Sequence, residues 1–450
     1  MNTLKLLWNL HKMKKNTQHT KQQIQNLQQE QLYRLLHYAY DHSSYYRASF
    51  ERAGITQGTI DVTPITEFPV INKKLLMKHF DELVTVKDVR QDELRIFDEQ
   101  DTLDERFKGK YHVVHSSGST GKPGYFIYDE DAWNQMLLAI IRGALWGMSM
   151  TSILRLLWKT PRIAYIAACD GRYGGAMAVG SGIEGVHAKQ LSLDVNQPLH
   201  EWIDSIQEFK PNIIIGYASA IKILAELAET GKVSVHIERI ISCGEPLNAN
   251  LRNYLKQVFH CDIVNFYGAS ESLALGVEVQ ASEGMILFDD MNYIEIENGK
   301  MYLTSLYNYA QPLIRYEMSD RIQWKEQETG LPFQSIKTIS GRQEDLMWFE
   351  DEVGKREFLH PLAIEGFCIE GMLDYQFIQK DKQFFELDIE VSKDDCKKNI
   401  LEKMTESLKE ILKEKKLEYV DFIIVFVDEI LPDRATGKKQ LIIQQRGALV

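Results

Sequence analysis

The chain has 450 residues, of which 44% are hydrophobic and 26% are charged. This is the composition of an ordinary globular protein with room for about three domains. The net charge of −12 argues against a general nucleic-acid binder, which should carry a basic surplus. No apolar run approaches the roughly 18 residues that a membrane-spanning helix requires. We therefore expect a protein without nucleic-acid partners and without stable membrane insertion.

The cysteines and the N-terminal residues indicate the cellular compartment in which the protein is expected. The five cysteines are scattered and form no Cys-x-x-Cys pair. This usage is typical of a reducing compartment and argues against both a disulfide framework and a structural zinc site. The first 15 residues are basic and partly amphipathic, but they lack an apolar core followed by a small-residue cleavage site. We interpret them as a surface helix, with a weak membrane-surface contact as the alternative, and expect a cytoplasmic protein.

The first hundred residues predict mainly helices. Apolar residues at three- and four-residue intervals give residues 17–53 one apolar stripe. The stripe includes Leu32, Leu35, Leu36 and Ala39. Asn72 is a candidate N-cap for a helix that ends at about Leu83. Residues 92–106 are charged, and we expect loops there.

Strand-like and helical segments alternate in the middle of the chain. The predicted strands cover residues 126–128, 163–168, 212–216, 239–242 and 262–266. The predicted helices cover residues 129–146, 219–230 and 248–259. Short β-rich runs separated by helices of this length are typical of a parallel sheet with helices on its faces. Ligands of such sheets bind at loops beyond the carboxyl ends of the strands, which here follow Gly216, Cys243 and Phe266.

The last third of the chain has a different pattern. Residues 285–324 contain short alternating runs, which predict an antiparallel sheet. Residues 344–450 combine strands with a charged amphipathic helix at 394–415, and about a hundred residues suffice for a small domain. We therefore predict an α/β fold. Residues 1–343 would form a large multi-subdomain N-terminal domain with mainly parallel sheets and helices, and residues 344–450 a small α+β C-terminal domain.

A loop rich in glycine and hydroxyl residues follows Val113 and Val114. It contains Ser116, Ser117, Gly118, Ser119, Thr120, Gly121 and Lys122. Glycine lets backbone N–H groups approach an anion, hydroxyls add neutral donors, and lysine adds a positive charge. The loop is not a Walker A motif, because Ser116 replaces its first glycine and Pro123 its final hydroxyl residue. The composition favours polyphosphate binding, with a polar surface turn as the alternative.

Further motifs follow this loop along the chain. Residues 267–271 are Tyr-Gly-Ala-Ser-Glu, residues 316–321 Tyr-Glu-Met-Ser-Asp-Arg, residues 341–345 Gly-Arg-Gln-Glu-Asp, and residues 431–438 begin with Leu-Pro and end with Gly-Lys. Together with the glycine loop, this set resembles the adenylate-forming superfamily of acyl-CoA synthetases and carrier-loading ligases. Residues 44–47, 54–55, 68–75 and 312–316 resemble its phenylacetate–CoA ligase and CapK-like branch in particular.

The resemblance implies a set of ATP- and AMP-binding residues. These are Ser116, Ser117, Gly118, Ser119, Thr120, Gly121, Gly244, Glu245, Pro246, Tyr267, Gly268, Ser270, Asp320 and Arg342. Tyr267 would stack on adenine or belong to the core. Asp320 would accept both ribose hydroxyls or pair with a neighbouring arginine. Glu245 is either part of the adenine crevice or structural.

The resemblance also implies residues for the chemistry. Lys122, Glu271 and Lys438 would be catalytic, with Lys439 as an adjacent competitor for the last role. Glu271 would bind Mg²⁺, because this hard cation prefers carboxylates and substrate phosphates, or it would be a solvated carboxylate at a helix start. Glu344 would be the hinge of the C-terminal domain. Tyr173, Gly174, Tyr217 and Phe266 would line an acyl pocket suited to an aryl or short acyl group, or ordinary core.

The implied function is ATP-dependent activation of a small carboxylic acid to an acyl-adenylate with release of pyrophosphate, followed by transfer to a thiol. The implied cofactors are ATP, Mg²⁺ and coenzyme A. One alternative acceptor is the phosphopantetheine of a separate acyl carrier protein acting in trans. Another alternative is a non-catalytic nucleotide-binding remnant, because Met318, Ser319 and Glu344 depart from the family pattern. Because the glycine loop does not match the Walker A motif, an NTPase or kinase is not expected.

Overall fold

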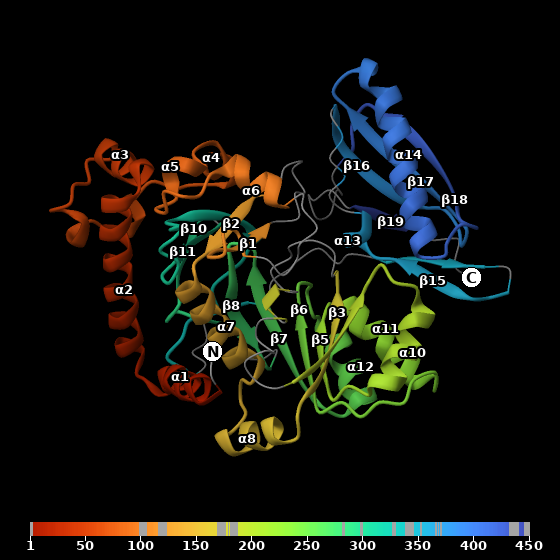
Figure 1. The fold of residues 1–450 in the computed structure, drawn as a ribbon, viewed down its shortest axis with the longest axis horizontal. Coiled ribbons are helices and arrows are strands. Elements are labelled where there is room, and N and C mark those ends of the chain that lie inside the picture. Colours follow the sequence, from red (N-terminus) through yellow and green to blue (C-terminus); the bar gives the residue numbers. More distant parts are fainter. Residues whose placement is uncertain are drawn as a thin grey trace.

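The computed structural model places most of the chain in helices and strands (Figure 1). It describes residues 3–98, 106–115, 124–168, 177–178, 180, 188–280, 284–297, 300–325, 330–337, 346–351, 353–364, 367, 369, 371–431 and 441–444. Among these residues, no helix is long and apolar enough to cross a bilayer.

Helices form the N-terminal region. They are α1 (Thr3–Lys15), η1 (Asn16–Gln18), α2 (Lys21–His42), α3 (Ser44–Arg52), η2 (Ile60–Val62), η3 (Ile65–Glu67), α4 (Lys73–Lys78), α5 (Phe80–Leu83) and α6 (Gln91–Asp98). The predicted apolar stripe is buried on α2, and Asn72 caps α4 as expected. The helix predicted to reach Leu83 is interrupted at His79. The prediction of loops was wrong for residues 92–98, because α6 forms there and Leu94 joins an apolar cluster with Phe80 and Phe107; residues 99–105 lie outside the described residues.

An eight-stranded sheet forms the centre of the molecule, in the order β13-β9-β8-β7-β6-β5-β3-β4. The strands are β3 (Arg162–Ala167), β4 (Lys189–Asp194), β5 (Ile213–Gly216), β6 (Arg239–Cys243), β7 (Asp262–Ala269), β8 (Ser272–Glu278), β9 (Met285–Leu287) and β13 (Ser335–Ile336). Strands β4, β3, β5, β6 and β7 are parallel, which confirms the predicted sheet. The other three run antiparallel to their neighbours.

Helices cover both faces of this sheet. They are α7 (Glu130–Ala144), α10 (Leu199–Phe209), α11 (Ala218–Glu229) and α12 (Ala249–Phe259), whereas α8 (Met150–Trp158) lies beyond the lower edge of the sheet (Figure 1). Alternate strand residues point to opposite faces, so Ile214 and Ile240 join the core beneath α10, α11 and α12. Ile213 and Ile241 join the other core, which α7 covers. Because the sheet is buried on both faces, successive residues of these strands are all apolar.

Two smaller sheets lie beside the central one. β1 (His112–His115) pairs with β2 (Tyr125–Tyr128) on either side of the glycine loop. β10 (Asn292–Glu297), β11 (Lys300–Ser305) and β12 (Tyr316–Arg321) form an antiparallel sheet. The predicted antiparallel region is therefore confirmed for these strands, whereas β9 joins the central sheet.

The C-terminal part has its own apolar core. It contains β14 (Met347–Glu350), β15 (Arg356–Leu359), α13 (Pro361–Ile364), β16 (Met372–Gln379), β17 (Phe384–Val391), η4 (Asp394–Cys396), α14 (Lys397–Glu414), β18 (Asp421–Val427) and β19 (Ile442–Gln444). Its sheet has the order β18-β17-β16-β19, and α14 packs on it (Figure 1). The predicted boundary residue Glu344 lies outside the described residues, so the division at 343/344 stays a prediction.

Candidate functional site

The turn between β7 and β8 holds Ser270 and Glu271 against the start of the glycine loop. Ser270 Oγ donates a hydrogen bond of 3.1 Å to the carbonyl oxygen of His115, the last residue of β1. The Tyr128 hydroxyl on β2 donates to the carbonyl oxygens of Ser270 and Glu271, at 3.0 and 3.2 Å. Both strands that flank the glycine loop therefore touch this turn, although about 150 residues separate the two motifs in sequence.

Tyr267 and Asp320 form the second contact between distant motifs. The Tyr267 hydroxyl donates to Asp320 Oδ2 at 2.7 Å, so the motifs at residues 267–271 and 316–321 meet through a direct hydrogen bond. Burial, followed by the charge and hydrogen bond of Asp320, raises the pKa of Tyr267. Tyr267 lies within β7 rather than in a loop, because that strand continues to Ala269.

Glu271 lies in a buried, polar neighbourhood. Its carboxylate is hydrogen-bonded to the Tyr316 hydroxyl and lies within electrostatic range of Asp320 and Lys73. Burial raises the pKa of Glu271, and Asp320 adds to this effect, while Tyr316 and Lys73 oppose it. Glu271 is half-buried in the turn between β7 and β8, so the alternative of a carboxylate at a helix start does not apply.

Lys73 is a neighbour of Glu271 that the sequence did not single out as a site residue. The adjoining segment is fixed by backbone pairing, since Ile71 N donates to Arg315 O at 3.2 Å and Glu317 N donates to Ile71 O at 2.8 Å. This pairing ties the start of α4 to β12. The only sequence signal was the position of Lys73 within the branch motif at residues 68–75.

The metal hypothesis rests on Glu271. Among the described residues, no group of three or more His, Cys, Asp or Glu side chains is arranged to hold a metal ion. Glu271 and Asp320 nevertheless interact electrostatically, and carboxylate oxygens are suitable donors for Mg²⁺, which usually takes few protein ligands plus phosphate oxygens. The donor set therefore fits an ion that arrives with a polyphosphate.

The segments that follow β5 and β6 are joined by contacts among Tyr217, Gly244, Glu245 and His360. Gly244 has a φ of +78°, and a Cβ there would lie 2.7 Å from a ring carbon of Tyr217, so glycine is required on both counts. The His360 ring stacks on Tyr217 with centroids 5.2 Å apart. His360 Nε2 lies 2.8 Å from Glu245 Oε1. The C-terminal part of the chain thus reaches the carboxyl ends of the central strands.

The Glu245 side chain is fully engaged in this cluster. It accepts hydrogen bonds from Ser219 N at 2.8 Å and Ser219 Oγ at 2.9 Å, in addition to His360. Burial opposes ionisation of Glu245, but the bonds from His360 and Ser219 outweigh it and hold its pKa below the usual value. This geometry favours the structural interpretation of the side chain. Sequence analysis missed His360, which no motif contains.

A buried ion pair makes a second contact between the C-terminal part and the central sheet. Lys415, directly after α14, lies 3.2 Å from Glu357 on β15, and its ammonium donates to Val195 O and Gln197 O at 2.8 and 2.7 Å. Glu357 in turn accepts from Leu199 N at the start of α10, at 2.6 Å. Burial lowers the pKa of Lys415, although Glu357 opposes this effect. We call these contacts the Lys415 clamp.

The two described residues of the predicted acyl pocket lie in different apolar clusters. Phe266 packs near Phe288, with ring centroids 6.2 Å apart, and Tyr217 packs against His360. The remaining predicted site residues lie outside the described residues. They are Ser116, Ser117, Gly118, Ser119, Thr120, Gly121, Lys122, Tyr173, Gly174, Arg342, Glu344 and Lys438. Their roles stay predictions.

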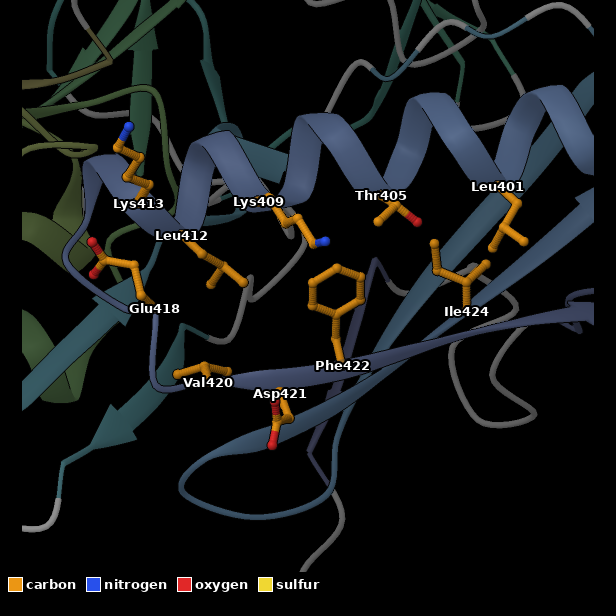
Figure 2. A pocket seen from close by; sticks show the side chains of 10 residues that line it. All are labelled: Leu401, Thr405, Lys409, Leu412, Lys413, Glu418, Val420, Asp421, Phe422 and Ile424. Atoms are coloured by element: carbon orange, nitrogen blue, oxygen red, sulfur yellow. The ribbon is translucent and has the colours of Figure 1, made fainter.

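A groove of about 600 Å³ lies between α14 and β18 (Figure 2). Its apolar wall includes Leu412, Phe422 and Ile424, and Lys409 and Asp421 lie at its rim. Neither element carries a predicted nucleotide-binding residue. We therefore do not assign this groove to the candidate site.

Comparison with protein families indicates the class of protein to which part of this chain is similar. Residues 110–286 match the family model described as AMP-binding enzyme. That segment contains the glycine loop, the strands from β1 to β8 and the turn that holds Ser270 and Glu271. This segment of the chain is therefore similar to AMP-binding enzymes.

Relatives narrow the class to one branch. The chain is 24% identical over 349 residues to a phenylacetate-coenzyme A ligase of Pseudomonas putida, covering 72% of each chain. It is 22% identical over 453 residues to Protein CapK of Staphylococcus aureus, covering 94% of this chain and 88% of the relative. The chain is thus similar over most of its length to members of the phenylacetate–CoA ligase and CapK-like branch. This confirms the resemblance seen in the sequence.

A solved structure supports the fold. A 2-hydroxyisobutyryl-CoA ligase, described as being in complex with 2-HIB-AMP and CoA in the thioesterification state, matches with a TM-score of 0.62 at 17% identity. The match covers 96% of this chain and 91% of that one. The arrangement of a large α/β part and a small C-terminal part is thus shared with an acyl-CoA ligase.

Proposed function

We propose that this chain is an AMP-forming acid–thiol ligase that activates a small carboxylic acid with ATP and transfers the acyl group to coenzyme A. The observation that carries this proposal is the convergence of three family motifs. Ser270 contacts the start of the glycine loop, Tyr267 contacts Asp320, and Glu271 lies in the same buried neighbourhood. The relatives are named as coenzyme A ligases, which supports coenzyme A as the acceptor.

The first half-reaction would join the acid to AMP. A carboxylate oxygen of the substrate attacks the α-phosphorus of ATP, the bond to the β-phosphate oxygen breaks, and pyrophosphate leaves. The glycine loop and Lys122 would hold the phosphates, and Asp320 would accept hydrogen bonds from the ribose hydroxyls. Because no covalent enzyme intermediate is needed, positioning and charge stabilisation supply the rate acceleration.

Glu271 would hold Mg²⁺ together with oxygens of the ATP phosphates. When bound, the ion would neutralise part of the negative charge that develops on the phosphates. Tyr316 and Lys73 would orient and balance the Glu271 carboxylate, since both already interact with it.

The second half-reaction would transfer the acyl group. The coenzyme A thiol, as thiolate, attacks the acyl carbon, and AMP leaves with the electron pair of the broken acyl–phosphate bond. A phosphopantetheine carrier protein acting in trans is the alternative acceptor, but no relative supports it. The aromatic and small residues of the predicted acyl pocket suit an aryl or short acyl group. Use of ATP and coenzyme A, together with the scattered cysteines, favours a cytoplasmic location.

The small domain would change position between the two steps. Two sets of polar contacts hold it in the present arrangement, the Lys415 clamp and the bonds of His360 to Glu245, and Phe358 on β15 also packs against Trp202 on α10. Rotation near Glu344 would release both sets together, because His360, Glu357 and Lys415 all follow that residue in the chain. Hinges of this kind are a few residues that absorb large φ/ψ changes.

The test is ATP–pyrophosphate exchange with a panel of aryl and aliphatic acids, followed by thioester formation with coenzyme A. We expect acid-dependent exchange. Lys438→Ala should abolish exchange but spare thioester formation from a supplied acyl-adenylate, whereas Glu344→Pro should spare exchange and block thioester formation. Lys439→Ala is the matched control, and its exchange activity should be close to that of the unchanged protein. No exchange with any acid and no ATP binding would refute the enzyme and favour the non-catalytic remnant.

A further inference from the structure

Two segments of this acidic protein contain no acidic residue. Residues 1–29 hold five lysines and no aspartate or glutamate. Residues 132–169 hold three arginines, one lysine and again no aspartate or glutamate. In a chain of net charge −12, two such stretches leave a local excess of positive charge wherever they come together.

The fold brings these segments together. Helix α1 packs on α7, where Leu10 and Leu138 share a small apolar cluster. Lys14 Nζ donates a hydrogen bond of 2.6 Å to Met148 O, two residues before α8 begins. Figure 1 shows α1 and α8 at the lower edge of the molecule, away from the small domain. Arg142 does not add to the surface charge, because it is buried and paired with Asp290, so the exposed basic side chains at this end include Lys12, Lys15 and Arg155.

The outward faces of both helices combine tryptophan with cationic side chains. On α1, Leu10 is buried, whereas Trp8 is 65% exposed and the Lys12 ammonium lies 5.9 Å from the centre of its ring. On α8, Ile153 and Leu156 are buried, whereas Leu154 and Trp158 are 49% and 91% exposed. Arg155 is exposed between them. We call Trp8, Lys12, Leu154, Arg155 and Trp158 the α1–α8 surface.

Exposed tryptophan beside basic side chains indicates which kind of partner this surface binds. Single exposed apolar side chains are normal, but two exposed tryptophans on one basic surface are not explained by packing. Tryptophan and leucine beside lysine and arginine on amphipathic helices are typical of proteins that lie on a membrane surface. Lipid headgroups with negative charge match the excess of positive charge. The described helices are too short or too polar to span the bilayer, so contact would be peripheral.

We propose that the α1–α8 surface binds an anionic lipid bilayer. The tryptophan rings and Leu154 enter the headgroup region, and Lys12 and Arg155 contact the lipid phosphates. The neighbouring Lys159 is not included, because it lies 3.8 Å from Glu238. This inference does not depend on the proposed reaction, since none of these residues belongs to the candidate site.

The test is co-sedimentation of the full chain with vesicles. We expect binding to phosphatidylcholine vesicles that contain phosphatidylglycerol and much weaker binding to pure phosphatidylcholine. Arg155→Glu and Lys12→Glu should each weaken binding about fivefold or more, from the electrostatic contribution of one basic residue. Trp158→Ser should weaken binding at about 0.1 M salt although it changes no charge, because it removes apolar contact with the bilayer. Raising salt from about 0.1 M to about 1 M should also release the protein, because screening shortens the range of attraction.

Matched controls come from the small domain. Val353→Ser changes another side chain that is 92% exposed, and Lys398→Glu reverses an exposed charge on α14. Both should leave vesicle binding unchanged, and unfolding curves should show that all variants fold. Absence of binding to anionic vesicles, or equal losses in the controls, would overturn the proposal. It would also be overturned if light scattering showed that Trp158→Ser only separates a dimer into monomers, because the surface would then bind a second copy of the chain.

Discussion

The Tyr267 hydroxyl donates a 2.7 Å hydrogen bond to Asp320 Oδ2, and this bond joins two motifs that lie more than fifty residues apart. Tyr267 is buried in β7, so its hydroxyl fixes one oxygen of the Asp320 carboxylate from the protein side. If Asp320 binds the ribose of ATP, Tyr267 acts on nucleotide binding by positioning Asp320. Stacking of the Tyr267 ring on adenine stays a separate prediction.

Tyr267→Phe tests this positioning role. A hydrogen bond to a charged group contributes about 1.5–3 kcal/mol, so its loss should raise KM for ATP roughly tenfold or more, with a smaller effect on kcat. Tyr33→Phe on α2 is the control, because that tyrosine lies far in sequence from every site motif. Steady-state kinetics of pyrophosphate exchange give both parameters. An unchanged KM for ATP would show that Tyr267 does not position Asp320 for binding.

Glu271→Gln separates a metal-binding role from a structural one. Burial raises the pKa of Glu271, so ionisation costs folding stability as pH rises through the folded-state pKa. Glutamine carries no such cost and can still accept the bond from Tyr316, so the variant should be at least as stable as the unchanged protein at neutral pH. Exchange activity should nevertheless fall and require more Mg²⁺, since an amide is a poor ligand for a hard cation.

The control for Glu271→Gln is Glu317→Gln, which removes a surface carboxylate that pairs with Lys300 at 2.7 Å. This change should affect neither the Mg²⁺ requirement nor, beyond about 1 kcal/mol, the stability. A loss of stability in Glu271→Gln with normal Mg²⁺ dependence would instead assign Glu271 a purely structural role.

The Lys415 clamp can be measured with a double-mutant cycle. Lys415→Met leaves Glu357 buried without its cation, which should cost about 3–5 kcal/mol in the free energy of local opening. Glu357→Gln combined with Lys415→Met should cost less than the sum of the single changes, because the two residues interact directly. Hydrogen exchange at the Leu199 amide reports the opening, since this N–H donates to Glu357. Lys416→Met, at the exposed neighbouring lysine, should have little effect; strict additivity would contradict the clamp.

The raised pKa of Asp289 predicts that the free energy of unfolding depends on pH. Burial, followed by the charge of Asp290, raises its pKa from 3.8 to about 7, although Gln334 N donates a hydrogen bond to it. Between these values the unfolded chain is ionised and the folded protein keeps the proton, so stability should fall as pH rises from about 4 to about 7. The loss should be on the order of 4 kcal/mol. Urea denaturation of Asp289→Asn should lack this loss, whereas Asp131→Asn at an exposed site should retain it.

The sequence by itself determined the local structure of the central sheet. Ile213, Ile214 and Ile215 form a continuous apolar run because β5 is covered on both faces, and such a run is visible without coordinates. Asn72, Asp129 and Asn248 occupy N-cap positions, as their side-chain chemistry predicts. The family motifs were equally local, since each is a short string of residues. By contrast, α6 was missed because its helix depends on burying Leu94 against distant residues.

Only the tertiary structure decided which residues meet. The hydrogen bond from Tyr267 to Asp320, the contact of Tyr316 with Glu271, and the bond between His360 and Glu245 join segments separated by dozens of residues or more. No periodicity encodes such pairs, because each depends on where the chain crosses itself and which polar groups lose water there. His360 and Lys415 are unremarkable in sequence. Because both side chains are buried, each needs a hydrogen-bonding or charged partner, and these partners are Glu245 for His360 and Glu357 for Lys415.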